Sequence, residues 1–125
     1  MGLTPRAAVN QWAAGFIGSA VIQGLFPRAF ARRSRWGYNG GWQREIAIWN
    51  VGMLTTIAAL RRQGADVDKG LMTGFMVLST LFGANHLVAA AQAPRSVGNW
   101  IGALANAVGV GTGLRVMAAD SKQPE

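Results

Sequence analysis

The sequence predicts an all-α fold, a four-helix transmembrane bundle that forms one domain over residues 1–118, followed by a disordered polar tail over residues 119–125. Three observations lead to this prediction. Only 14% of the residues are charged, well below the roughly 25% of soluble domains. Half of the residues are apolar, and the charges lie in short segments between long uncharged stretches. A length of 125 residues suits one domain.

The charge and cysteine content exclude several classes of function. The 12 Lys and Arg residues outnumber the 5 Asp and Glu residues, for a net charge of +7. A nucleic-acid partner would need these cations spread over one folded face. Because they lie in the connections, we expect no nucleic-acid partner. The sequence has no cysteine, which excludes disulfides, thiolate metal sites and cysteine catalysis.

The first uncharged stretch, Ala7 to Pro27, predicts a span over about residues 9–27. A hydrocarbon core of roughly 30 Å needs about 20 helical residues, and this stretch supplies them. One alternative is a cleaved signal peptide, because Ala29 to Ala31 read AFA, the small-x-small form of a cleavage site. A soluble bundle is another alternative, but its helices would show a charged face, which none of these does.

The second span must begin before its uncharged stretch does. Ile46 to Leu60 would reach only about 22 Å at about 1.5 Å per residue, which is too short to cross. We therefore predict a span over about residues 41–60, with Arg44 and Glu45 as helical residues just inside one boundary.

The remaining uncharged stretches predict spans over about residues 70–91 and 97–116. The connections read FPRAFARRSRWGYNGG, RRQGADVDK and APRSVGN. The first ends in a predicted turn at Asn39-Gly40-Gly41. In the third, Ser96 is a predicted N-cap. The tail after Arg115, AADSKQPE, is polar and predicted to be disordered.

Small residues at four-residue spacing are candidates for helix packing. In lipid, such pairs let two helix backbones approach closely. An additional glycine, Gly111, makes the end of the last helix a candidate partner-facing surface. The predicted packing residues are Gly15, Ser19, Gly70, Gly74, Gly98, Gly102, Gly109 and Gly113.

Each predicted span brings a polar side chain to a similar depth on the side where residues 28–35 lie. Counting about 1.5 Å per residue, these side chains lie about 3 to 8 Å inside the boundary, and two asparagines lie about 13 Å inside. Polar groups at such depths are costly and are often functional. The sequence therefore predicts a ligand or proton vestibule lined by Glu45, His86, Arg44, Gln23, Asn50, Asn99, Asn106 and Trp49.

Arg44 and Glu45 cannot simply pair, because adjacent helical residues do not face each other. One division has Arg44 reaching lipid phosphate while Glu45 turns toward His86, and the reverse division is also open. Trp49 is either a packing residue or a ligand wall. The sequence predicts no catalytic residue and no metal site, and it identifies no cofactor.

The sequence leaves the membrane orientation open. The two sides carry six Lys and Arg residues each, so the positive-inside rule has no excess to act on. The dense cluster Arg28, Arg32, Arg33 and Arg35 is predicted to contact lipid headgroups and suits an anionic, cytoplasmic leaflet.

The pattern GGWQREIAIWNVG, followed some thirty residues later by GANHLV and then by SVGN at the start of the last helix, resembles a family of small bacterial membrane proteins. These are four-helix, broadly DoxX-like proteins described only as a domain of unknown function. The resemblance covers Tyr38 to Val116. It implies a multi-pass protein of the bacterial cell (inner) membrane, and it supplies no reaction, cofactor or substrate.

Two function hypotheses follow. The first is an accessory or scaffolding subunit that packs in the lipid bilayer against other membrane protein chains or in a homo-oligomer. The second is a small-molecule or proton-coupled binding or transport protein that uses the vestibule. Haem ligation by His86 would need a second ligand from elsewhere. Hydrolysis by Ser, His and Asp is poorly supported, because the acids other than Glu45 lie in a connection or the tail.

Overall fold

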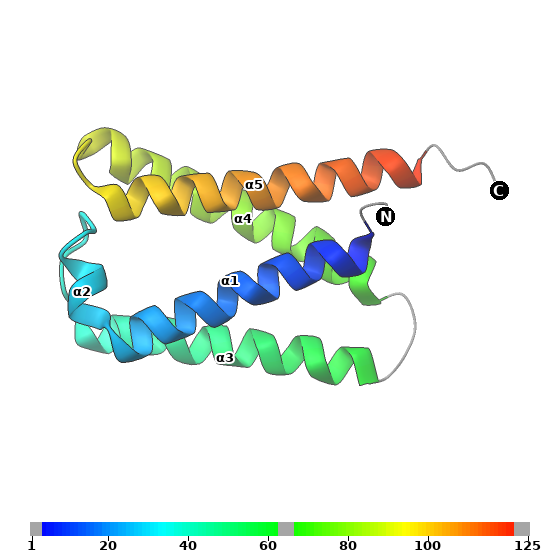
Figure 1. The fold of residues 1–125 in the computed structure, drawn as a ribbon, viewed down its shortest axis with the longest axis horizontal. Coiled ribbons are helices and arrows are strands. Elements are labelled where there is room, and N and C mark those ends of the chain that lie inside the picture. The colour runs from blue at the N-terminus through cyan, green and yellow to red at the C-terminus, as the bar shows by residue number, and fades with distance from the viewer. Residues whose placement is uncertain (1–3, 63–66, 122–125) are drawn as a thin grey trace.

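The computed structural model describes residues 4–62 and 67–121, and within these ranges the protein is all-helical. Four helices are long and one is short, and the described residues contain no strand (Figure 1). The elements are α1 (Pro5–Leu25), α2 (Pro27–Ala31), α3 (Gly40–Arg62), α4 (Val67–Gln92) and α5 (Val97–Asp120). The all-α prediction is confirmed, and each long helix covers most of one predicted span.

The helix boundaries follow from local chemistry. The Thr4 hydroxyl accepts a hydrogen bond from the Ala7 N–H at 3.2 Å, and Pro5 suits the first helical position because its missing N–H would have no helical partner. Pro27 ends α1 and begins α2 in the same way. Residues 27–31 were expected to be a connection and instead form this short helix.

The predicted turn at Asn39-Gly40-Gly41 is wrong. The Asn39 side chain accepts a hydrogen bond from the Trp42 N–H at 3.1 Å, and Gly40 begins α3. The left-handed backbone lies earlier, at Gly37, whose φ is 69°. Glycine adopts this conformation without steric cost because it has no Cβ.

The C-terminal boundary also differs from the prediction. Helix α5 continues to Asp120, so residues 119 and 120, predicted to belong to the disordered tail, are helical. Residues 122–125 lie outside the described part of the chain.

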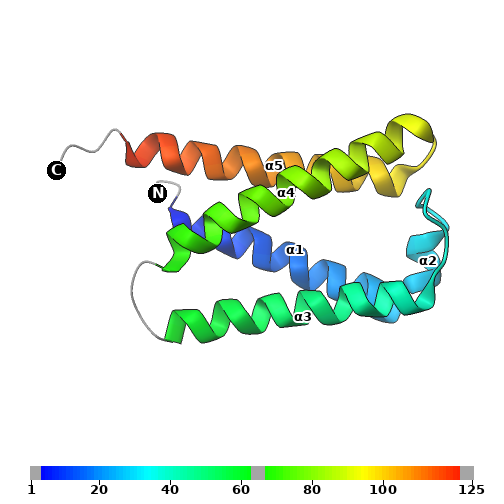
Figure 2. The ribbon, with the colours of Figure 1, turned by 180° about the vertical axis from the view of Figure 1, so that it is seen from behind.

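The four long helices form two pairs. Helix α1 packs mainly on α3, and α4 packs mainly on α5. Figures 1 and 2 show that the pairs converge where α1 and α4 begin and diverge toward α2. We name these the core end and the α2 end. The core cluster comprises Ala8, Val9, Trp12, Ile57, Met72, Phe75 and Val116.

Aromatic rings continue this core along the junction between the pairs. Phe16 on α1 lies 5.2 Å from Phe75 and 5.8 Å from Trp49 between ring centroids. Trp49 in turn lies 6.2 Å from Phe82 of α4. Through these edge-to-face contacts Trp49 packs between the two pairs, and its side chain remains partly exposed.

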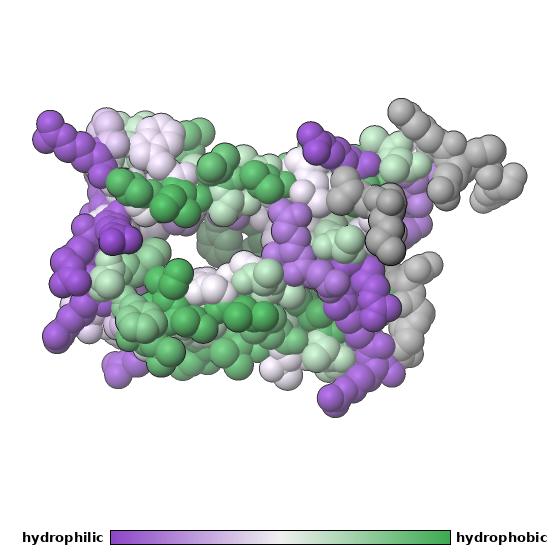
Figure 3. Space-filling view, viewed as in Figure 1, coloured by the Kyte–Doolittle hydropathy of each residue, from purple (hydrophilic) through white to green (hydrophobic). Residues whose placement is uncertain are grey.

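The face drawn in Figure 3 is largely apolar in the middle and charged toward both ends. Large apolar side chains are exposed on every long helix, such as Ile17, Ile48, Val77 and Leu104. By length and composition, α4 and α5 could each cross a membrane. Polar residues within α1 and α3, among them Gln23 and Asn50, make those helices less apolar.

The predicted packing residues of α5 lie at helix contacts. A Cβ on Gly98 would lie 2.6 Å from the Arg33 carbonyl oxygen, and one on Gly109 would lie 3.0 Å from the Trp12 indole nitrogen. Gly102 packs against the His86 ring, and Gly113 packs against Met76.

Three of the predicted packing glycines, on α1 and α4, make no helix contact within the described chain. A Cβ on Gly15, Gly70 or Gly74 would meet nothing within 4 Å, so these glycines face open space. Ser19 does lie at a contact, but through hydrogen bonds. Spacing alone identified small residues and could not tell which of them face a neighbouring helix.

Candidate functional site at the α2 end

The segment after α2, residues 32–39, is hydrogen-bonded to the first turn of α5. The Gly98 N–H donates to the Arg33 carbonyl at 2.8 Å, and the Arg35 N–H donates to the Asn99 Oδ1 at 2.9 Å. The Ser96 hydroxyl also donates to the Asn99 Oδ1. Ser96 occupies the predicted N-cap position, but its side chain makes no capping bond to the helix. Asn99 is fully buried and so holds two chain segments together.

His86 lies between this segment and α5. Its ring centroid is 4.8 Å from that of Trp36, and its ring packs on Gly102, which has no side chain to block it. Asn106 lies one turn farther along α5, half-buried, and donates to the Gly102 carbonyl at 2.8 Å. His86 is thus held by an aromatic ring and a glycine.

A separate amide cluster lies between α1 and α3. The Ser19 hydroxyl oxygen accepts from the Gln23 Nε2 at 2.9 Å and from the Asn50 Nδ2 at 3.0 Å. Asn50 also donates to the Ile46 carbonyl at 2.8 Å. Both amide residues are more than nine-tenths buried, so this cluster joins the two helices of one pair.

Gln43 is a buried polar residue that the sequence analysis missed. It is only 6% exposed and precedes the two charged residues that drew attention. The spacing of Gln43, Ala47, Asn50, Leu54 and Ile57, alternately four and three residues, marks the inner face of α3. That spacing is readable in the sequence, but the predicted vestibule included Arg44 and Glu45 and not Gln43.

Arg44 and Glu45 are both exposed. Neither makes a hydrogen bond or ion pair with any residue in the described ranges. The predicted approach of Glu45 to His86 therefore gains no hydrogen bond or ion pair to support it. The inner face of α3 carries Gln43 and Asn50, and position 45 lies off that face.

Four buried side-chain atoms within the described residues have no hydrogen-bond partner. They are the Gln23 Oε1, the Gln43 Oε1, the His86 Nδ1 and the Asn99 Nδ2. Each long helix contributes one of them. Such an atom costs about 1 to 3 kcal/mol when its desolvation is not compensated, so their concentration at the α2 end marks it as polar and incompletely satisfied.

The α2 end also carries a strongly positive surface. Glu45 is the single acidic residue among its exposed arginines in the described ranges. The Arg35 side chain donates to Gln92, and the Arg28 guanidinium lies 5.6 Å from the centre of the Tyr38 ring. We call the following residues the arginine surface: Arg28, Arg32, Arg33, Arg35, Arg44 and Arg95.

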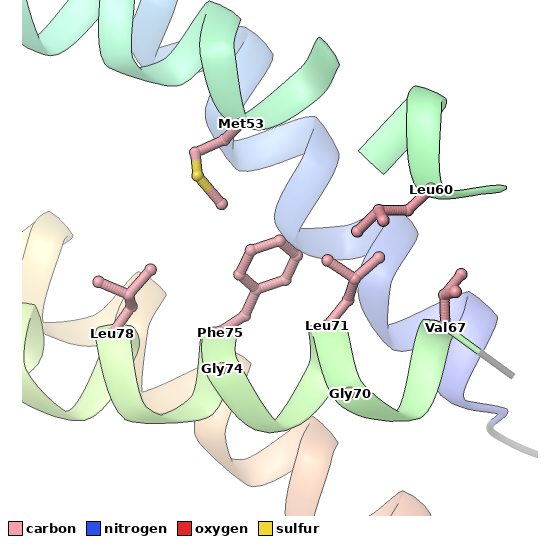
Figure 4. Close-up of a pocket in the computed structure, with 8 residues that line it drawn as sticks. All are labelled: Met53, Leu60, Val67, Gly70, Leu71, Gly74, Phe75 and Leu78. Carbon is pink, nitrogen blue, oxygen red and sulfur yellow. The ribbon is translucent and has the colours of Figure 1, made fainter. Parts of the chain in front are cut away.

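A different kind of hollow lies between α3 and α4, nearer the core end. This groove has a volume of about 440 Å³ and an apolar lining that includes Met53, Leu60 and Phe75, with Gly70 and Gly74 along the α4 backbone (Figure 4). No polar side chain lines it. It is therefore unlike the polar α2 end and contains none of the predicted vestibule residues.

These features define a helical protein with two helices able to cross a membrane and a polar, arginine-rich end. No protein-family model matches the chain, and no curated protein or solved structure matches it. Within the described ranges, no group of three or more His, Asp or Glu residues could hold a metal ion. The function is therefore argued from the geometry alone.

Proposed function

We propose that the protein is a small multi-pass membrane protein, with all four long helices in the bilayer. One observation carries this proposal, the apolar belt around the middle of the molecule. Ile17, Ile48, Val77 and Leu104, one from each long helix, are exposed by 53%, 71%, 57% and 67%. An aqueous protein rarely exposes so large a continuous apolar surface, whereas lipid solvates it.

We propose that this membrane protein is an accessory or scaffolding subunit. Nearly all of the described chain lies in the helices and their short connections, and each long helix exposes large apolar side chains to a neighbour. The open groove of Figure 4 supports this proposal, because its glycines and apolar walls leave room for a neighbouring chain.

Single-cysteine labelling tests the membrane proposal, because the sequence has no cysteine of its own. We expect Ile48→Cys and Leu104→Cys to resist a charged maleimide in intact membranes and to react after detergent is added. Arg32→Cys and Arg115→Cys should react from opposite sides of the membrane. Equal labelling of all four positions in intact membranes would contradict the proposal.

Purification in mild detergent tests the subunit role, and recovery as a free monomer would contradict it.

A small-molecule binding protein is the second candidate, and the four unpaired polar atoms favour it. Two of them, the Gln23 and Gln43 oxygens, are acceptors, and the Asn99 nitrogen is a donor. This pattern suits an uncharged polar ligand better than proton coupling, because no carboxylate of the described residues is hydrogen-bonded to His86. A thermal-shift screen tests this candidate. We expect a ligand that stabilises the unaltered chain to stabilise Glu45→Gln equally and to lose its stabilising effect on Gln43→Leu.

A further inference from the structure

We propose that the α2 end binds an anionic phospholipid, with its phosphate on the arginine surface and one acyl chain in the opening between the two helix pairs. This inference rests on the membrane location proposed above. It goes further by naming a lipid class and the residues that select it.

The charge at the α2 end selects an anion. Six arginines and one glutamate lie there, and all seven residues are exposed. At the core end, by contrast, two cations are neutralised by ion pairs, Arg61 with Asp68 at 2.8 Å and Lys69 with Asp120 at 2.7 Å. Guanidinium groups bind phosphate oxygens through paired hydrogen bonds, so the α2 end is the one suited to an anionic headgroup.

The arginine surface is also held in place before any lipid binds. Hydrogen bonds from Gly98 and to Asn99 fix the backbone of Arg33 and Arg35. The Trp36 ring rests on His86. Because the backbone is already ordered, less conformational entropy is lost on binding than for a mobile polybasic segment.

An opening between the two helix pairs adjoins the arginine surface. Figure 3 shows it between α5 and α1, and Figure 2 shows α3 and α4 diverging on the other side. Along α5 it lies between the contact of Gly109 with Trp12 and the contact of Asn99 with Arg35. These two positions are ten residues apart, about 15 Å along a helix. Trp49 and Phe82 meet where α3 approaches α4, and both remain partly exposed.

The side chains around the arginines suit a membrane interface. Exposed aromatic and apolar residues lie among the cations, as they do where proteins meet headgroups. Free phosphate or a soluble polyanion would make no contact with these apolar groups or with the opening. The exposed aromatic and apolar residues are Leu25, Phe26, Trp36, Tyr38, Trp42 and Trp100.

Native mass spectrometry of the full chain from nanodiscs tests the headgroup half of the proposal. The discs contain phosphatidylcholine with a minor fraction of phosphatidylglycerol. We compare a triple variant, Arg28→Gln, Arg32→Gln and Arg33→Gln, with a control that removes the same charge from the core end, Arg6→Gln, Arg62→Gln and Arg115→Gln. At about 1 kcal/mol per arginine, the first variant should bind phosphatidylglycerol about a hundredfold more weakly, and the control should bind as the unaltered chain does.

Fluorescence tests the acyl-chain half. Phosphatidylglycerol with a brominated chain should quench tryptophan emission at a low mole fraction, and Trp49→Phe should remove part of that quenching. Phosphatidylcholine with the same chain should show no Trp49 component at that mole fraction. Equal quenching by the two lipids would overturn this half of the proposal.

The outcomes separate this proposal from the membrane location. If alkaline carbonate releases the chain from membranes, the membrane location fails and the lipid site fails with it. If the chain stays in the bilayer but both triple variants retain phosphatidylglycerol equally, only the lipid site is overturned. Competition by inorganic phosphate as strong as by the lipid would likewise overturn it.

Discussion

At the core end the two helix pairs meet through apolar side chains, whereas at the α2 end they meet through hydrogen bonds to the backbone. Trp12 is the main contact at the core end, where its ring lies 5.8 Å from Phe75 and its indole N–H donates to the Ser79 hydroxyl at 2.8 Å. At the α2 end, Asn99 and Gly98 hold the segment after α2. One end is thus closed by packing, and the other is closed by a few polar contacts.

This difference predicts which end of the molecule should tolerate substitutions with little loss of stability. Between helices in lipid, van der Waals packing and interhelical hydrogen bonds supply most of the association energy. The core end makes many such contacts through a continuous cluster, and its described acids are in ion pairs. The α2 end leaves four buried polar atoms without partners. We therefore expect the core end to dominate stability and the α2 end to be adjustable.

Replacing Trp12 should have the largest effect. Trp12→Ala removes a side chain that is 9% exposed and leaves a cavity, so the free energy of unfolding should fall by about 3 to 5 kcal/mol. Trp42→Ala is the control, because Trp42 is 63% exposed, and its effect should stay within about 0.5 kcal/mol. Unfolding in mixed detergent micelles measures both. Similar losses for the two variants would remove the energetic distinction between the ends.

A glycine pair tests the contact at the α2 end. Gly98→Ala places a methyl 2.6 Å from the Arg33 carbonyl oxygen, and because that atom is backbone, the segment must shift. We expect a loss of about 1 to 3 kcal/mol and faster hydrogen exchange at the Arg35 amide. Gly111→Ala enters open space and should be neutral or stabilising by up to about 1 kcal/mol. If Gly98→Ala leaves exchange at Arg35 unchanged, the segment is not held as described.

The sequence predicted the helices well because their signals are long. Three of the four uncharged stretches have about 20 residues or more, and with the proline, glycine and arginine residues between them they left few alternatives for where each helix runs. The depth of Gln23, Asn50 and Asn99 along the helices was also predictable, since helical rise is fixed. All three are buried; Gln23 and Asn99 lie near the α2 end, and Asn50 lies near the middle of α3.

The facing of side chains was less predictable, because it depends on which helices pair. Nothing in the sequence states that α1 packs on α3 while α4 packs on α5. That pairing divides the predicted vestibule between two interfaces, with Gln23 and Asn50 in one and His86 and Asn106 in the other. Counting cations on each side was also insufficient, because two cations at the core end are in ion pairs, whereas no arginine of the α2 end is in an ion pair within the described ranges.

The smallest effects should come from two neighbouring positions on α3. Glu45→Gln changes an exposed side chain that has no ion pair within the described ranges, so the free energy of unfolding should change by less than about 0.5 kcal/mol. Gln43→Leu removes a buried oxygen without a partner and should stabilise the protein by about 1 kcal/mol. The comparison isolates the inner face of α3, because the two positions differ in burial and lie on one helix. A loss of more than about 1 kcal/mol in Glu45→Gln would show that the carboxylate has a partner. A similar loss in Gln43→Leu would show that its amide is satisfied in the membrane, and the polarity of the α2 end would then be structural.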